Sequence, residues 1–207
     1  MELGTIREFK ANSDAAVIVL HEIYGVNQHI LDLCAAQHTL GFDVYCPNFY
    51  GDAEPFPYNR QEEAYAFFMR HVGFEISPSI NAFAAQLRPR YARLFLLGSS
   101  VGATLAWLCA TSGLYDGVVC RYGSRIRDYP HLPPACPTLA IFARREKSFP
   151  PEAVESTLSG LPGIQVEIVD ADHGFCDSHS EHFDPQAAMR AEKLIKGFWE
   201  KLRRVSA

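Results

Sequence analysis

The sequence predicts an α/β fold with a mainly parallel central sheet, helices on both faces and a single domain over residues 1–207. Short apolar runs alternate with longer segments of helical spacing, an order typical of a doubly wound α/β fold. Most of these runs lack polar residues at every second position, as expected of strands covered on both faces. With 207 residues, 48% of them hydrophobic, the chain is long enough to bury one core.

The predicted strands are the apolar runs rich in β-branched and aromatic residues. The run Ala-Ala-Val-Ile-Val-Leu at residues 15–20 is the clearest, because every position is apolar. Such a strand needs cover on both faces, so it belongs inside the sheet. The strong runs are residues 15–20, 43–46, 93–97 and 138–142, and the weaker ones are residues 117–120 and 165–169.

The predicted helices lie between these runs, and right-handed connections place all strand-to-helix loops at one edge of the sheet, where ligands bind. We expect the stretch at residues 49–60, which contains prolines and several aromatics, to be an ordered loop over that edge. The last helix is the most regular, with an apolar stripe opposite its charges. The helices are residues 28–39, 61–69, 80–87, 101–111, 151–159 and 185–202, and the stripe is Met189, Leu194, Ile195, Phe198, Trp199 and Leu202.

The composition argues against several classes of partner. The chain has 24 acidic and 19 basic residues, a formal net charge of −5, and no long basic run, so nucleic acid and anionic membranes are poor partners. No segment approaches the ~20 apolar residues of a membrane span, and the first ten residues lack the apolar stretch of a signal peptide. We therefore expect a cytoplasmic protein, either a monomer or a homodimer.

The cysteines are spread singly, mostly within apolar runs, rather than in a disulfide framework. We expect them to be reduced thiols in the core. They are Cys34, Cys46, Cys109, Cys120, Cys136 and Cys176.

The segment Gly98-Ser-Ser-Val-Gly102 has the pattern G-x-S-x-G between a predicted strand and a predicted helix. A serine at this sharp turn is strained, so the residues two positions away on each side must be very small, and here both are glycine. The helix that begins at Val101 directs unpaired N–H groups toward the place where an oxyanion would form. Ser100 is therefore the candidate nucleophile. The structural alternative is an N-cap serine in a glycine-rich turn.

A serine nucleophile needs a histidine base and an acid that orients it, in the chain order Ser, acid, His. His173 follows the last predicted strand, in a short loop before the final helix, and is the candidate base. Glu146 is the carboxylate after the strand at residues 138–142, and the cations beside it favour its ionised form. A solvated charge cluster is the alternative reading of Glu146, and Asp170 and Asp172 are the reserve acids.

With these residues identified, the chain resembles the dienelactone hydrolase family, which has the α/β-hydrolase fold, over about residues 15–199. The segment His21-Glu-Ile-Tyr-Gly-Val-Asn27, the nucleophile elbow and the His-Gly-Phe at His173 carry the resemblance. It implies hydrolysis of carboxylic esters or lactones without a cofactor. It also implies that Ile23 and Val101 donate their backbone N–H groups to the oxyanion, and that Glu22 points toward the nucleophile, as a catalytic auxiliary or as a structural ion-pair partner.

Three departures from the family pattern matter. Ser100 stands where members often have cysteine, which makes the chain a more ordinary esterase. Glu146 replaces the usual aspartate, with the spacing to Pro150 retained. Asp177 stands where the dienelactone enzymes place an arginine that holds the substrate carboxylate, so dienelactone itself is a doubtful substrate.

We expect an open, aromatic pocket that suits small or aromatic acyl groups, because a chain this short has little room for a lid domain. The same aromatics could instead be core packing. The expected pocket aromatics are Tyr24, Phe49, Tyr50, Tyr122 and Phe175.

Two further hypotheses stay open at this point. A catalytically silent scaffold that serves as a ligand-binding or regulatory module is one, prompted by the atypical Glu146 and Asp177. The other is a zinc site, because imidazoles and a thiolate recur every three residues near the C-terminus. Its glycine and polar neighbours argue for a loop rather than a helix, so no metal is predicted. The residues concerned are His173, Cys176, His179 and His182.

Overall fold

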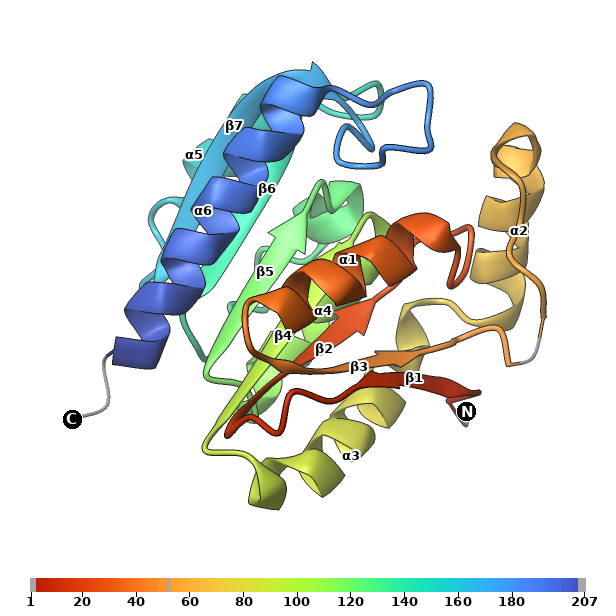
Figure 1. The fold of residues 1–207 in the computed structure, drawn as a ribbon. Coiled ribbons are helices and arrows are strands. Elements are labelled where there is room, and N and C mark those ends of the chain that lie inside the picture. Colours follow the sequence, from red (N-terminus) through yellow and green to blue (C-terminus); the bar gives the residue numbers. More distant parts are fainter. Residues whose placement is uncertain (1–2, 52, 205–207) are drawn as a thin grey trace.

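A computed structural model describes residues 3–51 and 53–204, so Asp52, in the predicted loop over the sheet edge, lies outside the described residues. The core of the fold is a seven-stranded sheet with the order β1-β3-β2-β4-β5-β6-β7 (Figure 1). All pairs from β3 to β7 are parallel, and β1 pairs antiparallel with β3 at one edge. The predicted fold class is confirmed.

Six strands correspond to the predicted apolar runs, and the seventh was not predicted. The edge strand β1 has the sequence Ile-Arg-Glu-Phe, whose two central charges are exposed, so it lacks the apolar run typical of a buried strand. The predicted run at residues 165–169 extends in the structure to Asp172. The strands are β1 Ile6–Phe9, β2 Ala15–Leu20, β3 Asp43–Pro47, β4 Arg93–Ser99, β5 Gly117–Arg121, β6 Thr138–Arg145 and β7 Ile164–Asp172.

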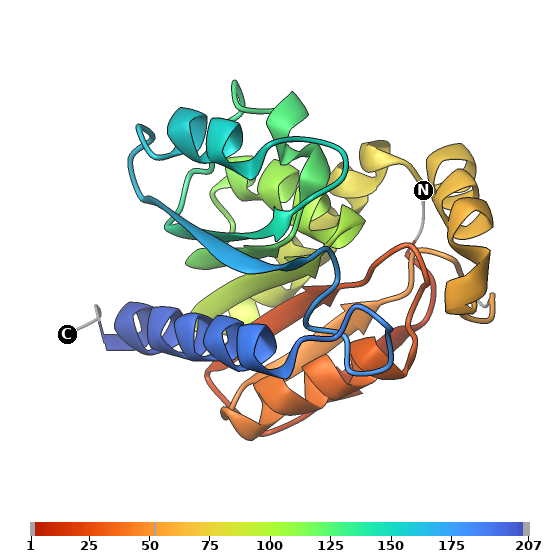
Figure 2. The same ribbon diagram turned by 90° about the horizontal axis from the view of Figure 1, so that it is seen from above.

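The helices cover both faces of the sheet, as predicted. Helices α1 and α6 pack on one face, while α3, α4 and α5 pack on the other, and α2 lies to one side of the sheet (Figure 2). The helices are α1 Gln28–Thr39, α2 Gln61–His71, α3 Ser77–Leu87, α4 Val101–Cys109, α5 Pro151–Leu158 and α6 Pro185–Arg204.

Besides shifts of one to three residues at other helix ends, α4 and α6 differ from the prediction. Helix α4 ends at Cys109 and continues as a 3₁₀ turn, Ala110–Ser112, before the left-handed Gly113. Met189 was assigned to the apolar stripe of α6, but its side chain is 66% exposed. The stripe that packs on the sheet instead starts with Ala187, Ala188 and Ala191, because these positions share the face of Ile195, Phe198 and Trp199.

Helix α4 is the central element of the fold. Eight of its nine residues are buried, because it packs between the sheet and α3. It follows β4, which lies between β2 and β5 in the middle of the sheet. The turn between β4 and α4 therefore lies at the carboxyl edge of the parallel strands, at the centre of the molecule.

All six cysteines are free thiols, and four of them are buried. Within the described residues, no helix combines the length and the apolar character that crossing a bilayer requires.

Candidate active site

Ser100 occupies the sharp turn between β4 and α4. Its backbone has φ 53° and ψ −117°, a strained conformation for a residue with a side chain. The Ser100 N–H donates to the carbonyl of Arg121 at 2.9 Å, and its carbonyl accepts from Ala103 and Thr104 at the start of α4. These bonds hold the turn from both sides, which leaves the hydroxyl projecting from the bend.

Two glycines make this bend possible because the backbone segments touch. A Cβ at Gly98 would lie 2.0 Å from the carbonyl oxygen of Gly102. A Cβ at Gly102 would lie 2.4 Å from the carbonyl oxygen of Leu20 on β2. Real Cβ atoms do not approach backbone so closely, so each position accepts glycine alone unless the backbone moves.

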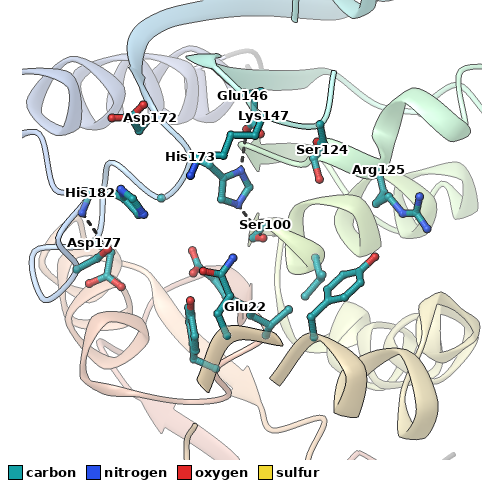
Figure 3. Close-up of a pocket in the computed structure, with 18 of the residues that line it drawn as sticks. Glu22, Ser100, Ser124, Arg125, Glu146, Lys147, Asp172, His173, Asp177 and His182 are labelled. Atoms are coloured by element: carbon teal, nitrogen blue, oxygen red, sulfur yellow. Dashed lines mark hydrogen bonds and ion pairs between the residues drawn. The ribbon is translucent and has the colours of Figure 1, made fainter. Parts of the chain in front are cut away.

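The structure brings the three predicted triad residues into one hydrogen-bonded chain (Figure 3). The hydroxyl of Ser100 lies 3.0 Å from Nε2 of His173. Nδ1 of the same imidazole lies 2.7 Å from Oε1 of Glu146. If Nδ1 carries the proton and donates it to Glu146, Nε2 is free to accept the proton of Ser100.

The surroundings of His173 change its pKa in opposite directions. Desolvation alone would lower the pKa of the imidazole, but the hydrogen bond and negative charge of Glu146, with the charge of Glu22, raise it above its ordinary value. The Glu146 side chain is 4% exposed, so its carboxylate acts in a poorly hydrated place. The pair is thus arranged to stabilise an imidazolium.

The two reserve acids are engaged elsewhere. Asp170 and Asp172 both bind Arg145, at 2.6 and 3.1 Å. A register shift between Ala143 and Arg145 interrupts the pairing of β6 with β7 at this point. Such irregularities bend a strand and redirect the side chains that follow, here those of the loop that carries Glu146.

The loop after β2 carries the two residues that the family resemblance singled out. Ile23 and Val101 both line the same cavity as Ser100. Neither of their N–H groups donates a hydrogen bond within the described part of the chain. The Tyr50 hydroxyl donates to the carbonyl of Ile23 at 2.7 Å, which holds the peptide between Ile23 and Tyr24, next to the one that carries the Ile23 N–H. Both N–H groups are therefore free to serve as oxyanion donors.

His21 holds the start of this loop through two hydrogen bonds. Its Nδ1 donates to the carbonyl of Glu22 at 2.7 Å, and its Nε2 accepts from the N–H of Phe49 at 2.9 Å. Full burial lowers the pKa of His21 to about 4, so the ring is neutral near pH 7 and can both donate and accept.

Glu22 lines the cavity beside Ser100 and is 6% exposed. Burial raises the pKa of Glu22, although the charges of His173 and Arg121 partly oppose this. Its Oε1 lies 4.0 Å from Nε2 of His29 and has no hydrogen-bond partner among the described residues. The weak contact with His29 does not satisfy Oε1, and a contact between the carboxyl group and the hydroxyl of Tyr122 opposes part of the rise in pKa.

Asp177 lines the cavity, but its carboxylate is engaged by neighbouring residues of the protein. Its side chain is 2% exposed; it accepts from the hydroxyl of Tyr58 at 2.6 Å and from the N–H of His179 at 2.9 Å. Nδ1 of His29 lies 3.6 Å from the same carboxylate. Asp177 thereby ties the loop after β7 to α1 and to the 3₁₀ turn Tyr58–Arg60, which is a structural role.

The cavity has a volume of about 490 Å³, and its aromatic lining differs from the prediction. Tyr24 lines it, as expected. Tyr122 and Phe175 do not: both are fully buried, and Tyr122 packs edge-on between the rings of His173 and Phe175. Phe49 and Tyr50 are also core residues, because they cover the underside of the loop after β2.

Other residues of the cavity wall were missed. Tyr58 and Tyr65 supply the aromatic surface that the prediction sought elsewhere; Tyr58 belongs to the loop expected over the sheet edge, and Tyr65 to α2. Thr104 comes one turn after Ser100 on α4, a spacing that could have identified it. Arg125 lies in a 3₁₀ turn that the sequence pattern did not predict.

The hypothetical zinc ligands are directed to different partners. His173 binds Ser100 and Glu146, His179 binds Asp32 at 2.9 Å, and His182 lies 3.9 Å from Glu181. Within residues 3–51 and 53–204, no group of three histidine, cysteine or carboxylate side chains is arranged to hold a metal ion.

Comparison with known proteins identifies the family of the chain. A model of the dienelactone hydrolase family matches residues 5–202. YczH of Bacillus subtilis, described as uncharacterized, is 36% identical over 195 residues, which cover 92% of this chain and 96% of that protein. A "Putative carboxymethylenebutenolidase" of Azospirillum brasilense is 27% identical over 204 residues, covering 89% and 86% of the two chains.

Solved structures share the fold. A dienelactone hydrolase-like promiscuous phosphotriesterase from metagenomic libraries superposes with a TM-score of 0.74 at 16% identity, over 97% of this chain and 99% of that one. The family match spans nearly the whole sheet and every element that carries the site. The chain belongs to the dienelactone hydrolase family, whose members are hydrolases of the ester and lactone type.

Proposed function

We propose that the chain is a serine hydrolase of carboxylic esters or lactones that works through an acyl-enzyme. One observation carries the proposal. The hydroxyl of Ser100, on a strained turn at the start of a helix, is joined to His173 and on to Glu146 by hydrogen bonds of 3.0 and 2.7 Å. The family match and the name of the Azospirillum relative, "Putative carboxymethylenebutenolidase", support the ester or lactone class.

In the first step, Ser100 Oγ attacks the carbonyl carbon while Nε2 of His173 takes the hydroxyl proton. The negative charge passes to the carbonyl oxygen, which the N–H groups of Ile23 and Val101 stabilise. The imidazolium then gives its proton to the leaving alkoxide, or to the alcohol oxygen of an opened lactone. An ester of Ser100 remains.

In the second step, a water molecule attacks this ester, and Nε2 of His173 takes one of its protons. Collapse of the tetrahedral intermediate returns that proton to Ser100 Oγ and releases the carboxylic acid. Glu146 keeps the proton on Nδ1 throughout and stabilises the imidazolium in both steps. The chain's own residues account for every proton transfer.

The test is covalent labelling together with turnover. A fluorophosphonate probe is expected to add one adduct at Ser100, located by peptide mass spectrometry. Ser100→Ala should abolish the adduct and lower kcat for phenyl acetate by about 10⁴-fold or more. Ser112→Ala removes an exposed serine hydroxyl outside the cavity and serves as the matched control.

A folded protein that shows no adduct and no turnover on a panel of esters and lactones would contradict the proposal. If such a protein still retained a ligand tightly, with Ser100→Ala unchanged in binding, a catalytically silent binding module would be the better description.

A further inference from the structure

A second hollow, the apolar pocket, lies against α5 and has a volume of about 230 Å³. The side chains of its described lining are apolar except for Arg127 and the hydroxyl of Thr157. Such a surface suits a neutral apolar group, because a charged or polar group would lose its hydration there without gaining partners. The apolar residues of the lining are Pro130, Phe149, Pro150, Ala153, Val154 and Leu158.

The apolar pocket and the catalytic cavity share a wall. Within the described residues, Arg127 is common to both linings. The chain after β6 passes from one space to the other, since residues 147–148 line the cavity and residues 149–150 line the apolar pocket. The triad acid Glu146 directly precedes this segment. The apolar pocket is therefore a neighbour of the space in which the reaction takes place.

The guanidinium of Arg127 forms the partition between the two spaces. Its Nη1 donates to the carbonyl of Ser124, a residue of the cavity wall that Figure 3 shows on the far side of Ser100 from Asp177. Its Cζ lies over the ring of Phe149, 5.2 Å from the ring centre, and Phe149 belongs to the apolar pocket. The head of one side chain thus touches both linings.

This partition is not part of the packed core. Nε of Arg127 lies 3.8 Å from the carboxylate of Asp128, which has a closer partner in Arg125 at 3.2 Å. The Arg127 and Asp128 side chains are 25% and 40% exposed, so water screens this ion pair and it contributes little to stability. A shorter side chain at position 127 should therefore leave the fold intact and join the two spaces.

We propose that Arg127 sets the length of the substrate that the site accepts, by closing the catalytic cavity against the apolar pocket. The proposal rests on the proposed function, because it concerns the choice of substrate at Ser100. The wild type prefers short neutral esters, since a longer alkyl chain meets the guanidinium and would strip water from it. Beyond Arg127, the apolar pocket is a binding site for a neutral alkyl group, which becomes accessible when the partition is removed.

The test compares chain lengths on both sides of the ester bond. kcat/KM is measured for para-nitrophenyl acetate and octanoate, which differ in the acyl group, and for ethyl and octyl acetate, which differ in the alcohol. Arg127→Ala should raise the ratio of the long to the short ester by about ten-fold in at least one series, because burial of each methylene group in apolar surroundings favours binding. The series that responds identifies the group that points toward the apolar pocket.

Two controls separate the apolar pocket from a general loosening of the site. Arg125→Ala removes an arginine of the same 3₁₀ turn, Ser124–Asp128, that lines the cavity but not the apolar pocket, and it should leave the ratio unchanged. Ala153→Phe, added to Arg127→Ala, refills the apolar pocket from α5 and should abolish the gain. Ser156→Phe places the same ring on a part of α5 outside the apolar pocket, and the gain should persist.

An unchanged ratio in both series, or a gain that survives both Ala153→Phe and Thr157→Phe, would overturn the proposal. Binding is measured separately by titrating methyl octyl ketone, which no hydrolase cleaves, into the same variants made in a Ser100→Ala background. Tighter binding after Arg127→Ala that Ala153→Phe reverses, without turnover of any ester by the Ser100 protein, would refute the hydrolase function and leave the apolar pocket standing.

Discussion

The nucleophile turn and the two loops that carry the base and the acid are held in place by different means. At the turn, backbone presses on backbone: a Cβ at Gly98 or Gly102 would lie 2.0 to 2.4 Å from a carbonyl oxygen. In the loops, side chains do the positioning. His173 is 37% exposed and is oriented by its hydrogen bonds to Ser100 and Glu146.

Because of this difference, we expect substitutions at the turn to change mainly the stability of the fold, and substitutions in the loops to change mainly the catalytic step. A change at the turn alters the packing of β2, β4 and α4 and should act on folding first. A change in the loops leaves the core intact and should act on the protonation of His173. The three predictions that follow test this division, from the largest expected effect to the smallest.

Glu146→Gln should lower kcat/KM by about a thousand-fold or more while the protein stays folded. The amide can donate to Nδ1 and so favour the tautomer with the proton on Nε2, which cannot accept a proton from Ser100. Glu146 raises the pKa of His173, and the base is active only above that pKa. Activity of the wild type therefore falls as pH drops through the raised pKa, and the residual activity of the variant should fall at a lower pH.

The pH dependence of kcat/KM measures both effects. Glu152→Gln removes an exposed carboxylate from the start of α5 and is the control for the loss of charge. An unshifted acidic limb in Glu146→Gln would show that this carboxylate does not set the protonation of His173.

Gly98→Ala should destabilise the fold by about 3 kcal/mol or more, because the strand or the helix must move to make room for one methyl group. Chemical denaturation measures the change in the free energy of unfolding. Gly197→Ala, in α6, is the control: its new Cβ would have no neighbour within 4 Å, and the helix should become more stable by about 0.5 to 1 kcal/mol. A Gly98→Ala protein as stable as the wild type would refute backbone packing as the constraint on the turn.

Arg145→Gln should have the smallest effect, less than about 1 kcal/mol in stability and less than about five-fold in kcat/KM. Its partners Asp170 and Asp172 are 75% and 48% exposed, so water screens these ion pairs. A hundred-fold loss of kcat/KM with an unchanged free energy of unfolding would mean that the exposed pairs, rather than Glu146, position His173.

The sequence was most informative where local chemistry allows one solution. Gly98 and Gly102 identified the turn because the conformation of Ser100 excludes larger neighbours. Glu146 could be predicted as the acid because it follows a parallel strand, and the loops that follow parallel strands meet at the carboxyl edge of the sheet. The all-apolar run of β2 likewise gave its residue range correctly, since burial on both faces leaves no polar position.

The sequence was least informative where tertiary packing decides. Tyr122 and Phe175 lie next to cavity residues in the chain, yet their rings turn inward and pack on each other. Tyr65 reaches the cavity because α2 lies beside it, and no local signal gives the place of that helix. The strand β1 was missed because a partly exposed edge strand shows little of the pattern by which buried strands are found.

The outer strand β7 has a further consequence for the molecule as a whole. It is the last strand of the sheet, so the outer row of its backbone N–H and carbonyl groups is not paired within the sheet. Its Glu167 pairs with Arg190, and its Asp170 and Asp172 pair with Arg145. A second copy that approached this edge would have to displace water from these charged groups, and charged side chains of this kind protect natural sheets from edge-to-edge aggregation.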